Sequence, residues 1–220
     1  MFQTEDWQLI AYPEAYEKQK VLFEHAIRQK LAGVAADNVL IFCEHPPVIT
    51  IGKSGKDKNL LVDSDMLASQ GVEVFRVDRG GDVTFHGPGQ LVGYPVFDLE
   101  SLHLGLKDYI HLLEEAVIRL LNTYGIQSSR LKGATGVWLD TDAPPATRKI
   151  CAIGVRSSHY VTMHGFALNV NTQLDYFRLI NPCGFVDKGV TSLEAELKTA
   201  TDMAEVKRRL LQIFFNLFGG

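Results

Sequence analysis

Positions 79–90 hold the densest run of residues that could take part in chemistry, with the sequence Arg-Gly-Gly-Asp-Val-Thr-Phe-His-Gly-Pro-Gly-Gln. The four glycines and the proline allow the backbone to approach a ligand closely and to expose its N–H groups. Arg79 adds a fixed cation, and His86 adds a group that can donate or accept a proton. We interpret this run as a binding loop. The alternative is a pair of tight β-turns with incidental polar residues.

Two further runs have the pattern of buried strands that carry a polar side chain. Lys149 begins the apolar run 149–156, and strand geometry would place it on one face with Cys151 and Ile153. Taken alone, a lysine at this point is more typical of a guarded strand end than of a catalyst. The run 161–171 contains His164 followed by Gly165, and a glycine inside a strand indicates a bulge or a close ligand approach.

Cys183 has the best environment for a nucleophile among the three cysteines. It lies between Pro182 and Gly184, and the backbone amides of such a turn can stabilise a thiolate and a developing oxyanion. Cys43 follows the apolar run 39–42 and is expected to be a small buried side chain. Cys151 is expected in the core as well, although it shares a strand face with Lys149 and is therefore the second candidate.

Three familiar catalytic or metal-binding patterns are absent. Gly52-Lys53-Ser54 resembles the end of a P-loop, but the earlier glycine of that motif is replaced by Pro47. His159 and His164 have the spacing of a zinc-finger pair without closely spaced cysteines. No Gly-x-Ser-x-Gly elbow occurs. We therefore expect no metal and no cofactor.

The elements that must position these residues follow from hydrophobic periodicity. Helices are predicted at 14–31, 106–124 and 202–218, with a short helix starting at the capping box Thr191–Glu194. Short β-like runs lie between them, at 38–43, 48–52, 72–77, 82–85, 91–97, 135–139, 149–155 and 160–170. The strands follow one another too closely for regular crossover helices. This predicts an α+β fold around a mixed, mostly antiparallel sheet flanked by helices.

Composition limits the class of protein. Of the 220 residues 46% are apolar, which is enough for a core, and no linker or repeat divides the chain, so we expect one domain over residues 1–220. The formal net charge of −4 disfavours nucleic-acid and membrane partners. The N-terminus does not resemble a signal peptide, and three cysteines are too few for a disulfide framework. We therefore expect a cytoplasmic location.

Taken together, the motifs resemble the octanoyltransferases of lipoate biosynthesis. The resemblance rests on six blocks in the family's order, which are Glu44–Val48, Arg79–Gln90, Thr135–Trp138, Lys149–Val155, His164–Asn169 and Pro182–Gly184. It implies a catalytic module similar to that of lipoate–protein and biotin–protein ligases. It also implies octanoyl-acyl carrier protein as donor. The implied acceptors are lysines on the lipoyl domains of 2-oxo-acid dehydrogenases and on the glycine-cleavage H protein.

The resemblance also assigns roles to residues. Cys183 is the implied nucleophile, which forms an acyl-thioester intermediate, and Lys149 is the residue that activates it. The implied acyl-substrate pocket comprises Arg79, Gly80, Gly81, Asp82, Val83, Thr84, Phe85, His86, Ala152, Ile153, Gly154, Gly165, Phe166 and Ala167. The side chains of Val83, Phe85, Ile153, Phe166 and Leu168 are candidate walls for an octanoyl chain.

The residue types support this chemistry independently. Exchange of a thioester donor for a cysteine thioester is nearly isoenergetic, and attack by an amine then forms a stable amide, so no ATP is required. An ammonium at Lys149 would favour the Cys183 thiolate. Two alternatives stay open. One is an ATP-dependent lipoate–protein ligase, which needs no cysteine. The other is a non-catalytic module that binds acyl chains or lipoyl domains.

Overall fold

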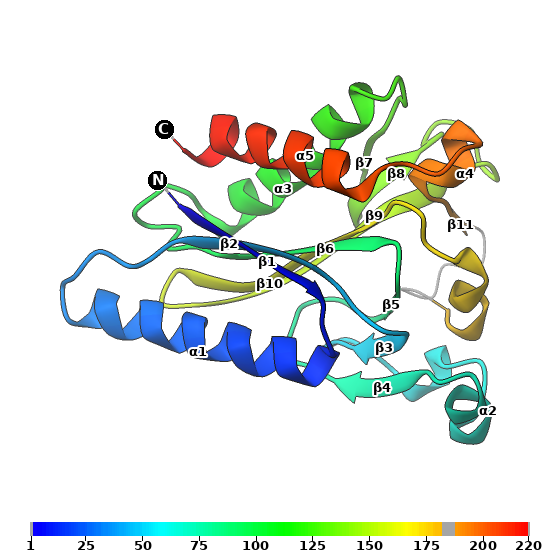
Figure 1. The fold of residues 1–220 in the computed structure, drawn as a ribbon, viewed down its shortest axis with the longest axis horizontal. Helices are drawn as coiled ribbons and strands as arrows, with labels where there is room; N and C mark the ends of the chain where they lie inside the picture. The colour runs from blue at the N-terminus through cyan, green and yellow to red at the C-terminus, as the bar shows by residue number, and fades with distance from the viewer. Residues whose placement is uncertain (1, 182–187, 220) are drawn as a thin grey trace.

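Two β-sheets organise the chain in the computed structural model, which describes residues 2–181 and 188–219 (Figure 1). The order of the main sheet is β1 (Gln3–Leu9), β2 (Val39–Glu44), β6 (Gln90–Val96), β10 (Val161–Asn169), β9 (Arg148–Ser158), β8 (Ala134–Leu139) and β7 (Ser129–Leu131), and β11 (Gly189–Val190) also pairs with β9. The small sheet has the order β4 (Glu73–Arg76), β3 (Val48–Ile51) and β5 (Val83–His86).

The pairing confirms the predicted α+β class with a mixed, mostly antiparallel sheet. In the main sheet, β1 pairs with β2 and β11 with β9 in parallel, whereas the other neighbours are antiparallel. The predicted strands occur within a few residues of their expected bounds. Their division into two sheets was not predicted, because the pattern of a strand does not specify its partner.

Three long helices cover the two faces of the main sheet. Helix α1 (Tyr12–Leu31) packs on one face, and α3 (Leu106–Asn122) and α5 (Met203–Phe218) cover the other (Figure 1). Each helix buries an apolar stripe, including Phe23 in α1, Leu113 in α3 and Phe214 in α5. The helices predicted from this periodicity are therefore confirmed. No helix within the described ranges has both the length and the apolar character needed to cross a membrane.

The shorter helices border the small sheet and the C-terminal region. They are η1 (Asp57–Asn59), α2 (Ser64–Ser69), η2 (Leu174–Leu179) and α4 (Leu193–Leu197). Helix α4 was predicted to start at a capping box headed by Thr191. In the structure the cap is Ser192 instead, and its side chain accepts a hydrogen bond from the backbone N–H of Ala195.

Strand β1 had no signal in the sequence. Six of its seven side chains are exposed, so it lacks the alternation of apolar and polar residues that marks a half-buried strand. Its backbone joins the sheet through a parallel register that begins with Gln3 opposite Val39. Tertiary pairing alone makes this segment a strand.

Candidate active site

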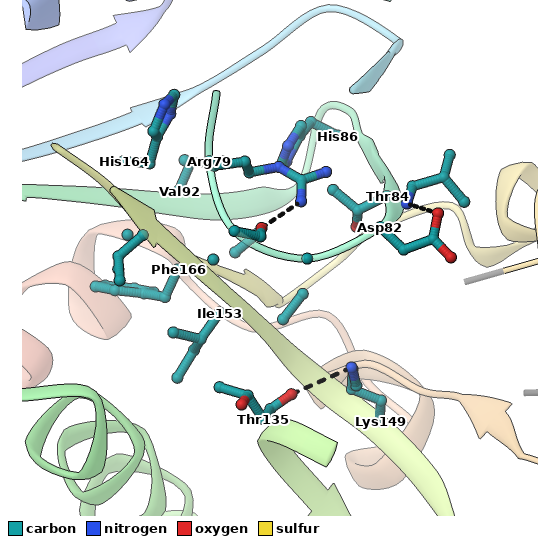
Figure 2. A pocket seen from close by; sticks show the side chains of 18 of the residues that line it. Arg79, Asp82, Thr84, His86, Val92, Thr135, Lys149, Ile153, His164 and Phe166 are labelled. Atoms are coloured by element: carbon teal, nitrogen blue, oxygen red, sulfur yellow. Dashed lines mark hydrogen bonds between the residues drawn. The ribbon is translucent and has the colours of Figure 1, made fainter. Parts of the chain in front are cut away.

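A cavity of about 490 Å³ lies between the main sheet and β5 of the small sheet (Figure 2). Its wall includes Lys149 and most of the residues predicted for the acyl pocket, namely Arg79, Gly80, Gly81, Asp82, Val83, Thr84, His86, Ala152, Ile153, Gly154, Gly165, Phe166 and Ala167. These residues come from three separate motifs. The fold therefore brings together runs that are up to 88 positions apart (167 − 79).

Two residues considered as walls of this cavity lie elsewhere. The ring of Phe85 stacks on Tyr176 at a centroid distance of 4.7 Å, in the core of the small sheet. Side chains alternate along β5, so the Val83 side chain shares a face with Phe85 and packs in the same core, although Val83 also borders the cavity. Leu168 is fully buried in the core under α3 and α5. Of the five candidate walls, Val83, Ile153 and Phe166 line the cavity.

The loop at residues 79–82, which precedes β5, covers the cavity and lies very close to β9. A Cβ atom added to Gly154 would lie 2.7 Å from the carbonyl oxygen of Gly80 and 3.3 Å from Cδ of Arg79. Any side chain at position 154 would therefore have to displace the loop. Arg79 is 8% exposed, and its guanidinium donates to the Thr50 carbonyl at 2.8 Å and to the Gly80 carbonyl at 3.0 Å. Arg79 thereby ties the loop to β3.

One end of the cavity holds the ammonium of Lys149. Its Nζ donates to the Thr135 carbonyl at 3.3 Å and lies 4.5 Å from the centroid of the Trp138 ring (Figure 2). Gly136, with φ of +121°, allows β8 to lie this close to β9, because a Cβ there would lie 2.5 Å from the Cys151 carbonyl oxygen. On the other side of β9, Val190 of β11 is the register partner of Lys149.

The middle of the cavity is apolar. Ile153 and Phe166, which are register partners on β9 and β10, lie between Lys149 and His164 in Figure 2. The Phe166 ring fits over Gly93, where an added Cβ would come within 2.1 Å of the ring carbon Cζ. An apolar wall beside a cation suits a chain with a reactive polar head and a hydrocarbon tail.

The opposite end of the cavity is polar and buried. It includes Tyr12, His86, Tyr94 and His164. The Nδ1–H of His86 donates to Gln90 Oε1 at 2.8 Å, because the amide nitrogen of Gln90 itself donates to other groups. Burial is the largest cause that lowers the pKa of His86 to about 3. His86 is therefore neutral at physiological pH.

His45 does not line the cavity but contacts Tyr94 at this polar end. Its Nδ1–H donates to the Ile10 carbonyl at 2.8 Å, so Nε2 accepts from the Tyr94 hydroxyl at 2.7 Å. Burial lowers the pKa of His45 to about 4. The ring is thus locked as a neutral tautomer that fixes the Tyr94 side chain.

Cys43 and Cys151 are fully buried, as their apolar sequence contexts predicted. Burial raises the pKa of each thiol well above its usual range. Both therefore stay protonated at neutral pH and are poor nucleophiles. The predicted nucleophile, Cys183, lies outside the described residues. Within those residues, no group of three or more His, Cys, Asp or Glu side chains is arranged to hold a metal ion.

Several cavity residues were not selected as site residues from the sequence. Thr135, His164 and Asn169 stand inside motifs that the resemblance quoted, so a signal for them existed. Tyr12 and Ile110 lie on long helices and line the cavity only because of how those helices pack. Nothing in the local sequence distinguishes these two from ordinary core positions.

Comparison with known proteins accords with this architecture. The model of the lipoyl protein ligase A/B catalytic domain matches residues 12–215. The chain belongs to this family. A relative in Parabacteroides distasonis, named octanoyltransferase, is 57% identical over 217 residues, which cover 99% of this chain and 98% of the relative. The resemblance inferred from the six motif blocks is thereby confirmed.

Solved structures of related architecture support the fold assignment. A bi-partite lipoate protein ligase from Thermoplasma acidophilum has a TM-score of 0.73 at 16% identity, over 99% of this chain and 84% of the ligase chain. A biotin protein ligase from Aquifex aeolicus has a TM-score of 0.52 at 14% identity, over 100% and 70% of the two chains. At these identities the similarity shows the shared fold alone.

Proposed function

We propose that this protein is an octanoyltransferase that acts in protein lipoylation. In this proposal it transfers an octanoyl or lipoyl group from acyl carrier protein to a specific lysine of a lipoyl domain. The acceptors are lipoyl domains of 2-oxo-acid dehydrogenases and the glycine-cleavage H protein. The observation that carries the proposal is a cavity with the Lys149 ammonium at one end and the apolar walls Ile153 and Phe166 beyond it.

The proposed reaction has two acyl transfers. In the first, the Cys183 thiolate attacks the donor's thioester carbonyl, a new carbon–sulfur bond forms, and the carrier's thiolate leaves and takes up a proton. In the second, the acceptor lysine amine attacks the Cys183 thioester, an amide forms, and the Cys183 thiolate leaves. Lys149 as an ammonium stabilises the thiolate in both steps and can relay the proton that the amine loses.

The chain on either side of Cys183 supports its assignment as the nucleophile. The backbone N–H of Asn181 donates to the Asn59 carbonyl at 2.8 Å. On the other side, Val190 pairs with Lys149, and the N–H of Thr191 donates to the Lys149 carbonyl at 2.9 Å. In the sequence, position 183 is seven residues from Val190 (190 − 183), the register partner of Lys149.

We also propose that the whole chain, residues 1–220, forms one catalytic domain that works in the cytoplasm. Free thiols persist in a reducing compartment, and Cys43 and Cys151 are free. The formal net charge of −4 does not favour nucleic acid or an anionic membrane as a partner. The proposed chemistry uses side chains alone and needs no cofactor.

An ATP-dependent lipoate–protein ligase is the second candidate. It is favoured by one finding, that the family and the solved structures of this fold include ligases. A ligase would activate a free acid as an acyl-adenylate and would not need Cys183. The two candidates therefore differ in donor, in energy source and in dependence on one thiol.

The deciding experiment supplies octanoyl-acyl carrier protein and an apo lipoyl domain, with ATP and magnesium removed. We expect octanoylation of the lipoyl-domain lysine, detected by intact mass, and its loss in Cys183→Ala. Cys43→Ala serves as the matched control, because it removes a thiol that is fully buried and does not line the cavity. Modification with free octanoate and ATP, but not with the carrier thioester, would establish the ligase instead. Binding of the acyl donor without any transfer would support the non-catalytic alternative.

A further inference from the structure

The loop that covers the cavity joins β4 to β5 of the small sheet, and it also contacts the main sheet. On the side of the small sheet, backbone N–H groups of residues 52, 53 and 54 donate to the carbonyls of residues 82, 79 and 81 at 3.0–3.1 Å. On the side of the main sheet, the backbone N–H of Gly80 donates to the Val155 carbonyl at 2.9 Å. Side-chain contacts add to the attachment on this side.

Asp78 provides that attachment. One carboxylate oxygen accepts a hydrogen bond from Nε2–H of His164 at 2.9 Å, and the other forms an ion pair with Arg156. Arg156 and His164 stand on adjacent strands, where Arg156 pairs with Met163 and Val155 with His164. The carboxylate therefore joins the loop to both β9 and β10. The hydrogen bond from His164 is the largest cause that lowers the pKa of Asp78, so the group is ionised at neutral pH.

The partners of Asp78 are themselves held in place. His164 has φ of +62°, which is uncommon for a residue other than glycine and persists only where the surroundings impose it. Its side chain is 2% exposed, and its backbone N–H donates to Gln19 Oε1 of α1 at 3.3 Å. The Arg156 guanidinium lies 5.0 Å from the centroid of the Phe23 ring, also on α1. Asp78 thus attaches the loop to two residues that are themselves in contact with α1.

The position of this loop determines the space beneath it. The carbonyl oxygen of Gly80 lies so close to Gly154 that a side chain at position 154 would clash with it. Arg79, Gly80, Gly81 and Asp82 all line the cavity. A loop detached from β9 and β10 would leave the space above Ile153 wider and less defined.

We infer that Asp78 is a positioning residue, which holds the loop 79–82 against β9 and β10 and thereby shapes the acyl-binding cavity. Asp78 does not line the cavity itself, and its effect on substrate passes through the loop and through His164, which both line the cavity. This inference rests on the proposed function for its kinetic consequence, whereas the attachment of the loop can be measured without any activity.

The test compares Asp78→Asn with Asp6→Asn. Asparagine keeps an acceptor for His164 and loses the charge that attracts Arg156. Asp6 pairs with Lys207 at 2.8 Å, away from the cavity, and controls for loss of an ion pair in general. Hydrogen–deuterium exchange of residues 77–83 is measured in both variants, together with kcat and KM for the octanoyl donor and the thermal midpoint.

We expect faster exchange at 77–83 in Asp78→Asn alone, and kcat/KM lower by about tenfold, mainly through KM, as expected when a hydrogen-bonded charge pair is weakened. Asp78→Asn combined with Arg156→Gln should lose little more than the first change alone, because both remove the same contact. Unchanged exchange at 77–83 in Asp78→Asn would overturn the inference. If the wild type transfers no octanoyl group, the proposed function fails, and the exchange result alone decides the role of Asp78.

Discussion

The Lys149 ammonium donates a hydrogen bond to the backbone carbonyl of Thr135 at 3.3 Å, across the pairing of β9 with β8. A lysine at a strand end is ordinarily a solvated, mobile cation. Here the carbonyl of Thr135 and the ring of Trp138 hold the charge at the wall of the cavity. Because its position is fixed, the Lys149 ammonium can stabilise a negative charge on one particular neighbouring group.

Lys149→Met should slow acylation of Cys183 strongly, because it removes the charge and keeps most of the side chain's bulk. An ordinary thiol has a pKa of about 8.5, and a nearby cation lowers it by about one to three units. The rate of Cys183 alkylation against pH, with Cys43 and Cys151 changed to Ala, measures this directly. The midpoint should rise in Lys149→Met. An unchanged midpoint would mean that Lys149 does not activate the thiol.

Incubation with octanoyl-acyl carrier protein should add a single octanoyl group, and that group should map to Cys183. The reason is the contrast with Cys43 and Cys151, which are fully buried and whose pKa values are raised by burial. Intact mass and peptide mapping check the outcome. A label on Cys151, or one that persists in Cys183→Ala, is incompatible with the proposed nucleophile.

Gly136→Ala should destabilise the fold by about 3 kcal/mol, the upper part of the range for strained backbone. Its φ is +121°, and the new Cβ would lie 2.5 Å from the Cys151 carbonyl oxygen. Gly133→Ala is the matched control, with φ of +81° and no atom within 4 Å of the new Cβ, so it should lose only about 1 kcal/mol. Urea unfolding of both variants measures the difference. Equal losses would show that the contact with β9 carries no cost.

The protein should lose stability as the pH falls below about 6.5. His45 has a pKa of about 4 in the folded state, below its ordinary value, so the unfolded chain binds more protons between these two values. Stability from this group is present above pH 6.5 and is lost progressively down to pH 4. The loss is up to about 1.4 kcal/mol per pH unit.

His45→Gln isolates this contribution, because glutamine does not titrate and can still donate to the Ile10 carbonyl. The free energy of unfolding is measured by urea at several pH values from 7.5 to 4.5. The slope against pH should be shallower in His45→Gln than in the wild type, whatever the absolute stability of the variant. Identical slopes would show that His45 is not the source of the acid sensitivity.

Local pattern identified the helices, and the resemblance to octanoyltransferases identified the motifs that form the wall of the cavity. The apolar stripe of α1 was predicted over 14–31 and is observed over Tyr12–Leu31, and the stripe of α3 was predicted over 106–124 and is observed over Leu106–Asn122. The glycines that follow Arg79 were interpreted as part of a binding loop, and in the structure Gly80 and Gly81 line the cavity. An amphipathic helix depends on the spacing of apolar residues and a glycine-rich loop on the absence of side chains. Both properties can be read from residues that are close together in the sequence.

Tertiary structure decided which distant segments meet. Asp78 and His164 are 86 residues apart, and no periodicity links them. The ring of Phe85 belongs to the core of the small sheet rather than to the cavity, because η2 supplies the aromatic partner Tyr176. The division of the strands into two sheets creates the space between β5 and the main sheet. Each of these outcomes depends on how elements far apart in the sequence pair and pack. The free energy of such contacts cannot be read from any single segment of the chain.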